Sequence, residues 1–197
     1  ESRLAQDIKR IDKVLAGERP NYNDIKVYLD SPQALIETNF SAGNSYCKAI
    51  LCLLAYQEPK DFRDNGKVIL DNSWLKVANS KNYHHFFPKA YLKGKTVLDS
   101  NSLMNITLVS DHLNKRKIGA KSPSVYVGDF ADQNSDINIA LNSHFIDING
   151  YGIESDDYQQ FLSARSKEIF DHLKSRIELT HTEPANEKIE ELIFGGE

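Results

Sequence analysis

The sequence contains little cysteine and no long apolar run. Cys47 and Cys52 are the only two cysteines, and both lie in one apolar stretch. A disulfide between them inside a single helix would be strained, so we expect two thiols in a helix interior and a reducing, cytoplasmic location. No run of about 18 apolar residues is present, and no secretion leader opens the sequence, so no membrane span is expected. Because the first residue is Glu1, we expect the chain to be part of a longer protein.

Composition permits a real core, and charge is distributed unevenly. The 197 residues are 40% hydrophobic and 26% charged, which suits one or two compact units. The net charge is −4, but residues 81–121 carry eight basic and two acidic side chains, and residues 122–197 carry five basic and 15 acidic ones. A basic segment inside an acidic chain indicates contact with a polyanion. The alternative is a solvated surface with chance clustering of charge.

Hydrophobic periodicity predicts a mainly helical α+β chain. Leu4, Ile8, Ile11 and Leu15 recur at helical spacing, and Gly17 with Pro20 would end that helix. Further helices are expected over residues 32–38, 43–56, 111–118, 136–146, 156–179 and 185–194, with another beginning near Ser122. Strands are expected over residues 67–71, 83–87 and 105–109.

Two histidines and two asparagines form the most informative pattern. His84 and His85 precede Phe-Phe-Pro88, and Asn105 stands nine residues before Asn114. Adjacent strand residues point to opposite faces, so both histidines can face one site only if the strand ends or bends there, as Pro88 favours. Phosphodiester hydrolysis needs a base of near-neutral pKa, a divalent cation and positive charge for the backbone, and this segment offers candidates for all three.

This pattern resembles the HNH, or ββα-metal, nucleases. It is most similar to the HNH domain of GmrSD-type modification-dependent restriction enzymes, through His84-His85-Phe-Phe-Pro-Lys89, Asn105-Ile-Thr-Leu108, Asn114-Lys115 and Pro123-Ser-Val-Tyr126. The HNH domain of the RNA-guided CRISPR nuclease looks similar too, with an Asn pair at the same separation. The resemblance is specific over residues 82–126 and weaker in the flanks.

The resemblance implies a role for each matching residue. His85 would be the general base, and Asn105 would brace the loop between the strands and so orient it. His84 and Asn114 would bind a divalent metal ion, Mg²⁺ or Mn²⁺ in the first place, with Ni²⁺ or Zn²⁺ as alternatives because many family members carry Asp at the position of His84. DNA would be contacted by basic side chains near the motif: Lys89, Lys115, Arg116, Lys117 and Lys121.

The resemblance also implies an organisation and a biological setting. Residues 1–80 would form a helical N-terminal part, residues 81–126 the ββα-metal core, and residues 127–197 C-terminal helices that wrap it, in one compact domain. The chain would nick DNA as the effector of a phage-defence restriction system. Its partners would be DNA and an N-terminal nucleotide-hydrolysing domain of the same full-length protein, whose Asp-Gly-x-Gln-Arg signature is not in this sequence.

Two other functions stay open from the sequence. The chain could be a DNA-binding module that is inactive without the N-terminal domain. It could instead hold a structural zinc ion through His84, His85 and His112, although a tight zinc site usually has four nitrogen or sulfur ligands. If Asn114 is not a metal ligand, His112 is the alternative ligand.

Overall fold

The computed structural model describes residues 2–22, 29–70, 83–96, 98–110 and 118–177. These fall into two compact units, one made of residues 1–29 with 174–197 and the other of residues 30–173. In the first unit, α1 (Arg3–Leu15) begins at Ser2, whose hydroxyl accepts a hydrogen bond from the Ala5 N–H. Gly17, in the left-handed conformation, follows it. The predicted opening helix is confirmed.

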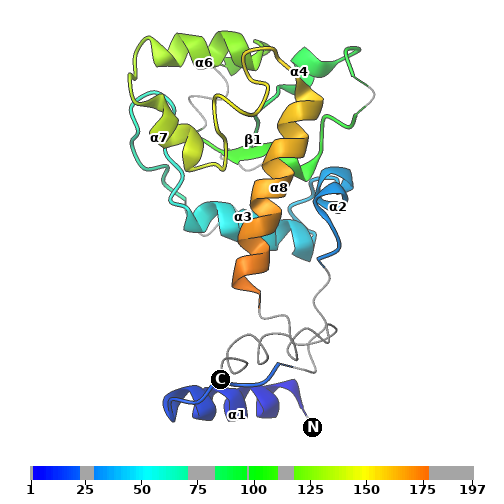
Figure 1. Cartoon of the computed structure of the whole chain (residues 1–197), viewed down its shortest axis with the longest axis vertical. Helices are drawn as coiled ribbons and strands as arrows, with labels where there is room; N and C mark the ends of the chain where they lie inside the picture. The colour runs from blue at the N-terminus through cyan, green and yellow to red at the C-terminus, as the bar shows by residue number, and fades with distance from the viewer. Residues whose placement is uncertain (1, 23–28, 71–82, 97, 111–117, 178–197) are drawn as a thin grey trace, which may run out of the picture. The chain divides into compact units, whose positions relative to one another are not determined.

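The second unit is α+β, with short helices around a two-stranded sheet (Figure 1). The sequence prediction of a mainly helical α+β chain is confirmed at this level. The described helices of this unit are α2 (Pro32–Glu37), α3 (Ser45–Tyr56), α4 (Lys89–Leu92), the 3₁₀ turn η1 (Leu103–Asn105), α6 (Pro123–Ala131), α7 (Ile137–Asn142) and α8 (Tyr158–Arg176). Polar caps start several of them. The Ser31 hydroxyl accepts from the Ala34 N–H, and the Asn44 side-chain oxygen accepts from the N–H groups of Tyr46 and Cys47 in the first turn of α3.

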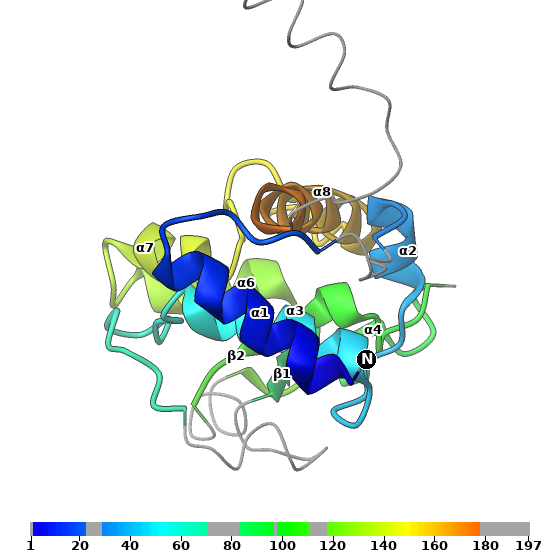
Figure 2. The same cartoon turned by 90° about the horizontal axis from the view of Figure 1, so that it is seen from below.

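The sheet consists of β1 (Tyr83–His85) and β2 (Ile106–Leu108), which pair antiparallel. In the register, Tyr83 faces Leu108, His84 faces Thr107 and His85 faces Ile106. Figure 2 shows the two strands side by side, with α8 on the other side of the unit. His85 is therefore the last paired residue of β1.

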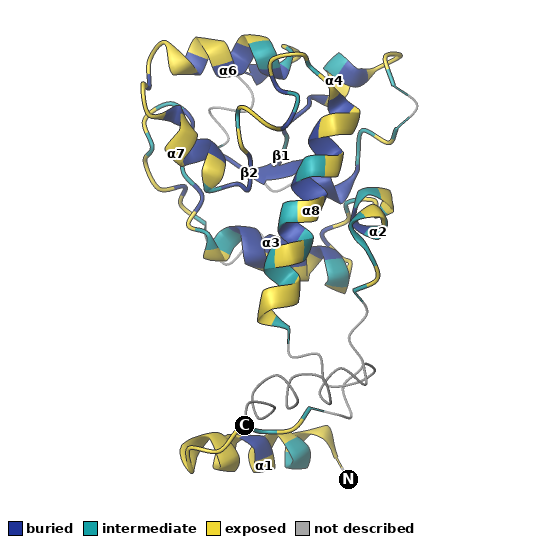
Figure 3. Cartoon of the chain, viewed as in Figure 1, coloured by how far each residue is buried: buried dark blue, intermediate teal, exposed yellow. Residues whose placement is uncertain are grey.

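One apolar core unites this unit, and its residues are among the buried ones coloured dark blue in Figure 3. It includes side chains from α3, the hairpin, α6, α7 and α8. Phe86, just after β1, stacks on Phe161 of α8 with ring centroids 4.8 Å apart and planes 7° apart. The segment that directly follows β1 is thus anchored in the core by aromatic stacking.

A fully buried cation joins the hairpin to the C-terminal helices. The Arg165 guanidinium on α8 donates hydrogen bonds to the backbone carbonyl of Met104 at 2.7 Å and to that of His144 at 3.1 Å. Burial lowers the pKa of Arg165 to about 10, while Tyr151 and Glu168 act in the opposite direction, so the group is still charged at neutral pH. Arg165 therefore ties the start of β2 to the segment that follows α7.

Several predicted elements differ from those observed. Residues 67–70 do not form the predicted strand, since Lys67 makes one isolated bridge with Lys60 and residues 68–70 are irregular. The strands of the hairpin are shorter than predicted, and α7 ends at Asn142 rather than near residue 146. Of the two cysteines, Cys47 is buried in α3 but Cys52 is exposed, and both are free thiols. The predicted helices over 111–118, apart from Ile118, and over 185–194 lie outside the described residues.

The part of the chain that the structure describes contains no helix long and apolar enough to cross a membrane.

The buried His144 generates a prediction about stability and pH. Its Nε2 lies 3.0 Å from the Lys60 carbonyl oxygen, and burial lowers its pKa from 6.5 to about 4, against the effect of that hydrogen bond. The unfolded chain therefore takes up a proton at higher pH than the folded chain does. We expect stability linked to His144 to be complete above pH 6.5 and to be lost towards pH 4, by about 3 kcal/mol in total.

Urea unfolding of the wild type and of His144→Gln, measured across this pH interval, checks the prediction. The free energy of unfolding of the variant should depend less steeply on pH. Equal slopes for the two proteins would show that His144 is not the linked group.

Candidate functional site

The predicted motif lies where the hairpin ladder stops. β1 ends at His85, and one more backbone hydrogen bond follows, from Phe86 N–H to the Asn105 carbonyl at 2.8 Å. The two histidines were predicted to require a strand that ends or bends near them, and β1 does end at His85. Beyond this backbone bond, the next hydrogen bonds across the hairpin are made by a side chain.

That side chain is the fully buried amide of Asn105. Its Oδ1 accepts from the Phe87 N–H at 2.8 Å, and its Nδ2 donates to the Phe87 carbonyl at 2.9 Å and to the Ser100 carbonyl at 3.0 Å. The amide thus pairs with Phe87 as an opposing strand residue would, and it also binds the loop that connects the strands. Because a buried backbone group without a partner is costly, these bonds fix the chain path just before Pro88.

The half-buried His85 ring faces the loop between α4 and η1. Its Nε2 lies 3.1 Å from the Asn101 side-chain oxygen. Burial lowers the pKa of His85 below its ordinary value, and the Lys89 ammonium acts in the same direction, whereas the Asn101 hydrogen bond and the Asp99 carboxylate oppose both. At neutral pH the imidazole is therefore mainly neutral and able to accept a proton.

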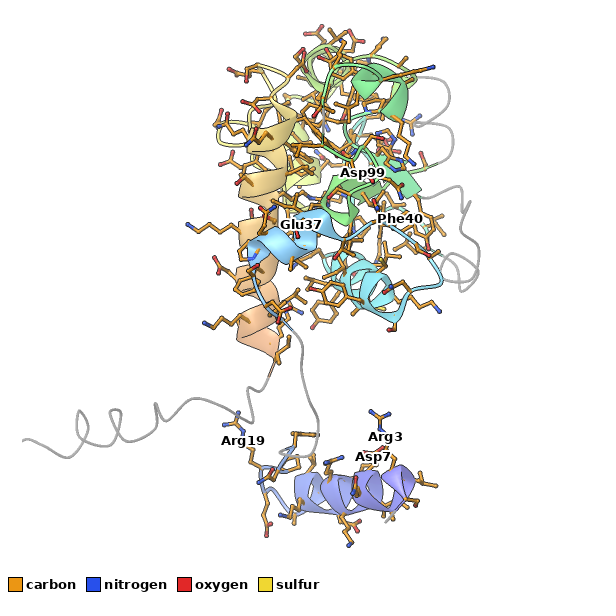
Figure 4. All side chains as sticks on the ribbon, turned by 90° about the vertical axis from the view of Figure 1, so that its right-hand side faces the viewer. Arg3, Asp7, Arg19, Glu37, Phe40 and Asp99 are labelled. Atoms are coloured by element: carbon orange, nitrogen blue, oxygen red, sulfur yellow. The ribbon has the colours of Figure 1, made fainter. Side chains whose placement is uncertain are left out.

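Asn101 is itself held by the segment between α2 and α3. Its Nδ2 donates to the Phe40 carbonyl at 3.0 Å, and the Phe40 N–H donates to the Asn101 carbonyl at 2.8 Å. Its own N–H donates to the Asp99 side chain at 2.7 Å, a local turn. Figure 4 labels Asp99 and Phe40 where these two segments meet.

His84 has a different environment from His85. It is 3% exposed, and its ring meets the Tyr126 ring of α6 edge-on, with centroids 6.4 Å apart. Tyr126 in turn donates its hydroxyl to the Phe86 carbonyl at 2.7 Å. The two histidine rings therefore contact different elements, α6 for His84 and the loop before η1 for His85.

The second half of the predicted metal site cannot be placed. Asn114 and His112 lie outside the described residues, as do Lys115, Arg116 and Lys117. Within the described ranges, no three or more His, Cys, Asp or Glu side chains are grouped so that they could hold a metal ion. The donor set predicted from the motif, one imidazole and one amide, suits a loosely held cation whose other ligands are waters or phosphate oxygens.

The exit of β2 towards Asn114 is fixed by a buried carboxylate. Asp61 is 6% exposed, and its Oδ2 accepts from the Ser110 hydroxyl at 3.0 Å while its Oδ1 accepts from the Arg63 N–H at 3.0 Å. Ser110 directly precedes the segment that carries Asn114. The sequence alone did not indicate that Asp61, 49 residues earlier, accepts a hydrogen bond from Ser110.

The basic side chains that can be placed differ in their surroundings. Lys89, Lys93 and Lys95 are exposed, and in the described part of the chain none of them forms an ion pair with a carboxylate. Lys95 lies over the Tyr91 ring, 3.7 Å from its centroid. Lys121 is different, because its ammonium lies 2.6 Å from the Asp129 carboxylate. Among the described residues, Lys89 at the start of α4 is the cation whose charge acts on His85.

Two contact residues were not predicted from the sequence, and a third, Tyr126, was named there only as part of the motif. Asn101, Phe40 and Tyr126 touch or hold the histidine segment, although they come from other elements. The run Asp99-Ser-Asn101 could have been recognised as a polar turn, but its contact with His85 depends on how the loop folds back.

No family model, no curated protein and no solved structure matches this chain. The functional argument therefore depends on the motif and on the geometry described above.

The Asn105 amide generates a stability prediction. Asn105→Ala leaves the Phe87 N–H and the carbonyls of Phe87 and Ser100 without this partner in a buried place, so we expect a loss of about 2 to 4 kcal/mol in the free energy of unfolding. The matched control is Asn149→Ala at an exposed position, which should change stability by less than about 0.5 kcal/mol. Urea unfolding measures both, and similar losses for the two variants would contradict the bracing role.

Proposed function

We propose that this chain is a divalent-metal-dependent DNA endonuclease of the HNH type, in which His85 is the general base. The observation that carries the proposal is the half-buried His85 imidazole at the end of β1. It is oriented through Nε2 by Asn101 and lies close enough to the Lys89 ammonium to be affected by its charge. A base held in this way beside an exposed cation suits hydrolysis of a phosphodiester.

The reaction uses the groups of the site in a simple order. Lys89 and its neighbours hold the DNA phosphate by charge. His85 takes a proton from a water molecule, whose oxygen attacks the phosphorus, and the bond from phosphorus to the leaving oxygen breaks. One such site cuts one strand, so the expected product is a nick.

His84 and Asn114 would hold the metal ion, which supplies charge stabilisation at the scissile phosphate when it is bound. Both ligands are uncharged, so binding should be weak without DNA. An imidazole ligand suits Mn²⁺, Ni²⁺ or Zn²⁺ better than Mg²⁺, although Mg²⁺ or Mn²⁺ are the first ions to test. A structural zinc site of His84, His85 and His112 is less well supported, because the described rings of His84 and His85 contact different elements.

The biological setting is proposed from the motif resemblance alone. We infer that the chain is the effector part of a cytoplasmic phage-defence restriction protein, with a nucleotide-hydrolysing domain N-terminal to it. In that arrangement the partner domain would control when DNA is nicked.

Plasmid nicking tests the proposed function. The purified chain should convert supercoiled plasmid to the open-circular form with Mg²⁺ or Mn²⁺, and EDTA should stop the reaction. His85→Ala should lower the rate by about 10²- to 10⁴-fold, because the proton acceptor is lost. His172→Ala on α8 is the matched control and should nick at the wild-type rate.

The other outcomes have definite meanings. If His85→Ala nicks as well as the wild type, His85 is not the base. If no variant nicks while all of them retard DNA on a gel, the chain is a DNA-binding module, active only with its partner domain if at all. If tight stoichiometric zinc copurifies, the structural zinc interpretation replaces the nuclease.

The different surroundings of the lysines give a second test. Lys89→Gln removes an unpaired charge near His85, so we expect weaker DNA binding and a slope of log affinity against log salt that is shallower by about 1. Lys121→Gln removes a charge already paired with Asp129 and should have a smaller effect. Lys167→Gln, an exposed lysine on α8, is the control for net charge. Equal effects of all three variants on binding would mean that Lys89 makes no specific phosphate contact.

A further inference from the structure

The amide of Asn101 has a fixed orientation. Carbonyl oxygens accept hydrogen bonds only, so the side-chain nitrogen of Asn101 must be the atom that faces the Phe40 carbonyl, 3.0 Å away. This choice removes the usual ambiguity between the oxygen and nitrogen of an asparagine. The oxygen of the amide is then the atom that faces His85.

The fixed amide determines where the His85 proton sits. The Asn101 oxygen, 3.1 Å from His85 Nε2, can only accept, so Nε2 must carry the hydrogen. A neutral imidazole has one protonated nitrogen, so the lone pair that can take a proton lies on Nδ1. The loop thus selects one of the two tautomers of the ring.

The support behind Asn101 limits its movement. Its backbone is bound on both sides, to the Asp99 side chain and to Phe40 N–H, in addition to the amide contact. Phe40 belongs to the connection between α2 and α3, so the chain of contacts runs from that connection through the loop to the base. A group tethered at three points keeps its partner ring in one orientation with little loss of entropy at the moment of reaction.

We propose that Asn101 is a positioning residue that holds His85 as the Nε2–H tautomer, so that Nδ1 accepts the proton of the attacking water. The inference rests on the proposed nuclease function for its catalytic consequence. In the step itself, a water O–H bond breaks, the oxygen bonds to phosphorus, and the proton goes to Nδ1. The bond to the leaving oxygen breaks, and that oxygen takes a proton from solvent. The Asn101 oxygen then faces the Nε2–H of an imidazolium and stabilises its charge.

The tautomer can be measured without any nuclease activity. Two-bond ¹H–¹⁵N correlations of the full chain, labelled with ¹⁵N-histidine and recorded above neutral pH, distinguish the two tautomers. The His85 signals are identified by their absence in His85→Gln. We expect the wild type to show the Nε2–H form and Asn101→Leu to show a mixture of the two forms. A wild-type ring protonated on Nδ1, or unchanged signals in Asn101→Leu, overturns the proposal.

Nicking kinetics then separate positioning from folding. Asn101→Leu has a similar size and no acceptor, and should lower kcat by about 10- to 100-fold with KM unchanged. Asn101→Asp keeps an acceptor oxygen for Nε2 but loses the Nδ2 donor to the Phe40 carbonyl, so it should restore part of kcat. In a His85→Ala background, Asn101→Leu should cause no further loss. A loss of the same size in that background, or equal kcat for the Leu and Asp variants, overturns the role. If the wild type does not nick, the proposed function fails, and the NMR measurement still decides the tautomer.

Discussion

The pairing of a side-chain amide with the backbone of Phe87 is the constraint on which the site depends. By taking the place of the next strand residue, Asn105 lets the sheet stop at His85 while the N–H and the carbonyl of Phe87 keep a hydrogen-bond partner. The following residues are then free to turn into the core, where Phe86 stacks on Phe161. The same amide holds the loop at Ser100, one residue before Asn101. The end of the strand, the anchoring of the chain and the placing of the loop therefore share one cause.

Periodicity predicted the helices better than the strands. Regular apolar spacing and polar caps locate α1, α2, α3 and α8 within a few residues, because both signals are local. The strands were predicted too long, since the apolar residues after His85 face the core without pairing to a neighbour. The run from Lys67 to Asp71 was predicted as a strand, but Lys67 makes only an isolated bridge with Lys60 and residues 68–70 are irregular, with Ile69 87% exposed. Apolar residues alone did not distinguish a strand that pairs in a sheet from an irregular apolar segment.

The site was predictable only where its residues belong to the motif. His85 and Asn105 stand out because their spacing matches a known pattern, and the structure places them on opposite sides of the hairpin end. Asn101 and Phe40 were not predictable, because their contacts join segments that are 16 and 61 residues apart in the sequence. Such contacts follow from the tertiary packing. No local pattern of residue types encodes them.

The surroundings of His85 would meet two opposing requirements on the base that we propose it to be. A proton acceptor at neutral pH must resist protonation, which burial against the hairpin and the loop provides. It must also lie close to a phosphate, which exposed lysines attract. Lys89 serves both requirements, since its charge lowers the pKa of His85 and would bind the same phosphate that the activated water attacks. The hydrogen bond between Nε2 and Asn101 raises the pKa of His85 and so offsets part of this decrease. It also holds the ring in place, while Nδ1 stays available to accept a proton. Burial, the Asn101 amide and the Lys89 ammonium thus act together on the pKa of His85, and the amide also orients the ring.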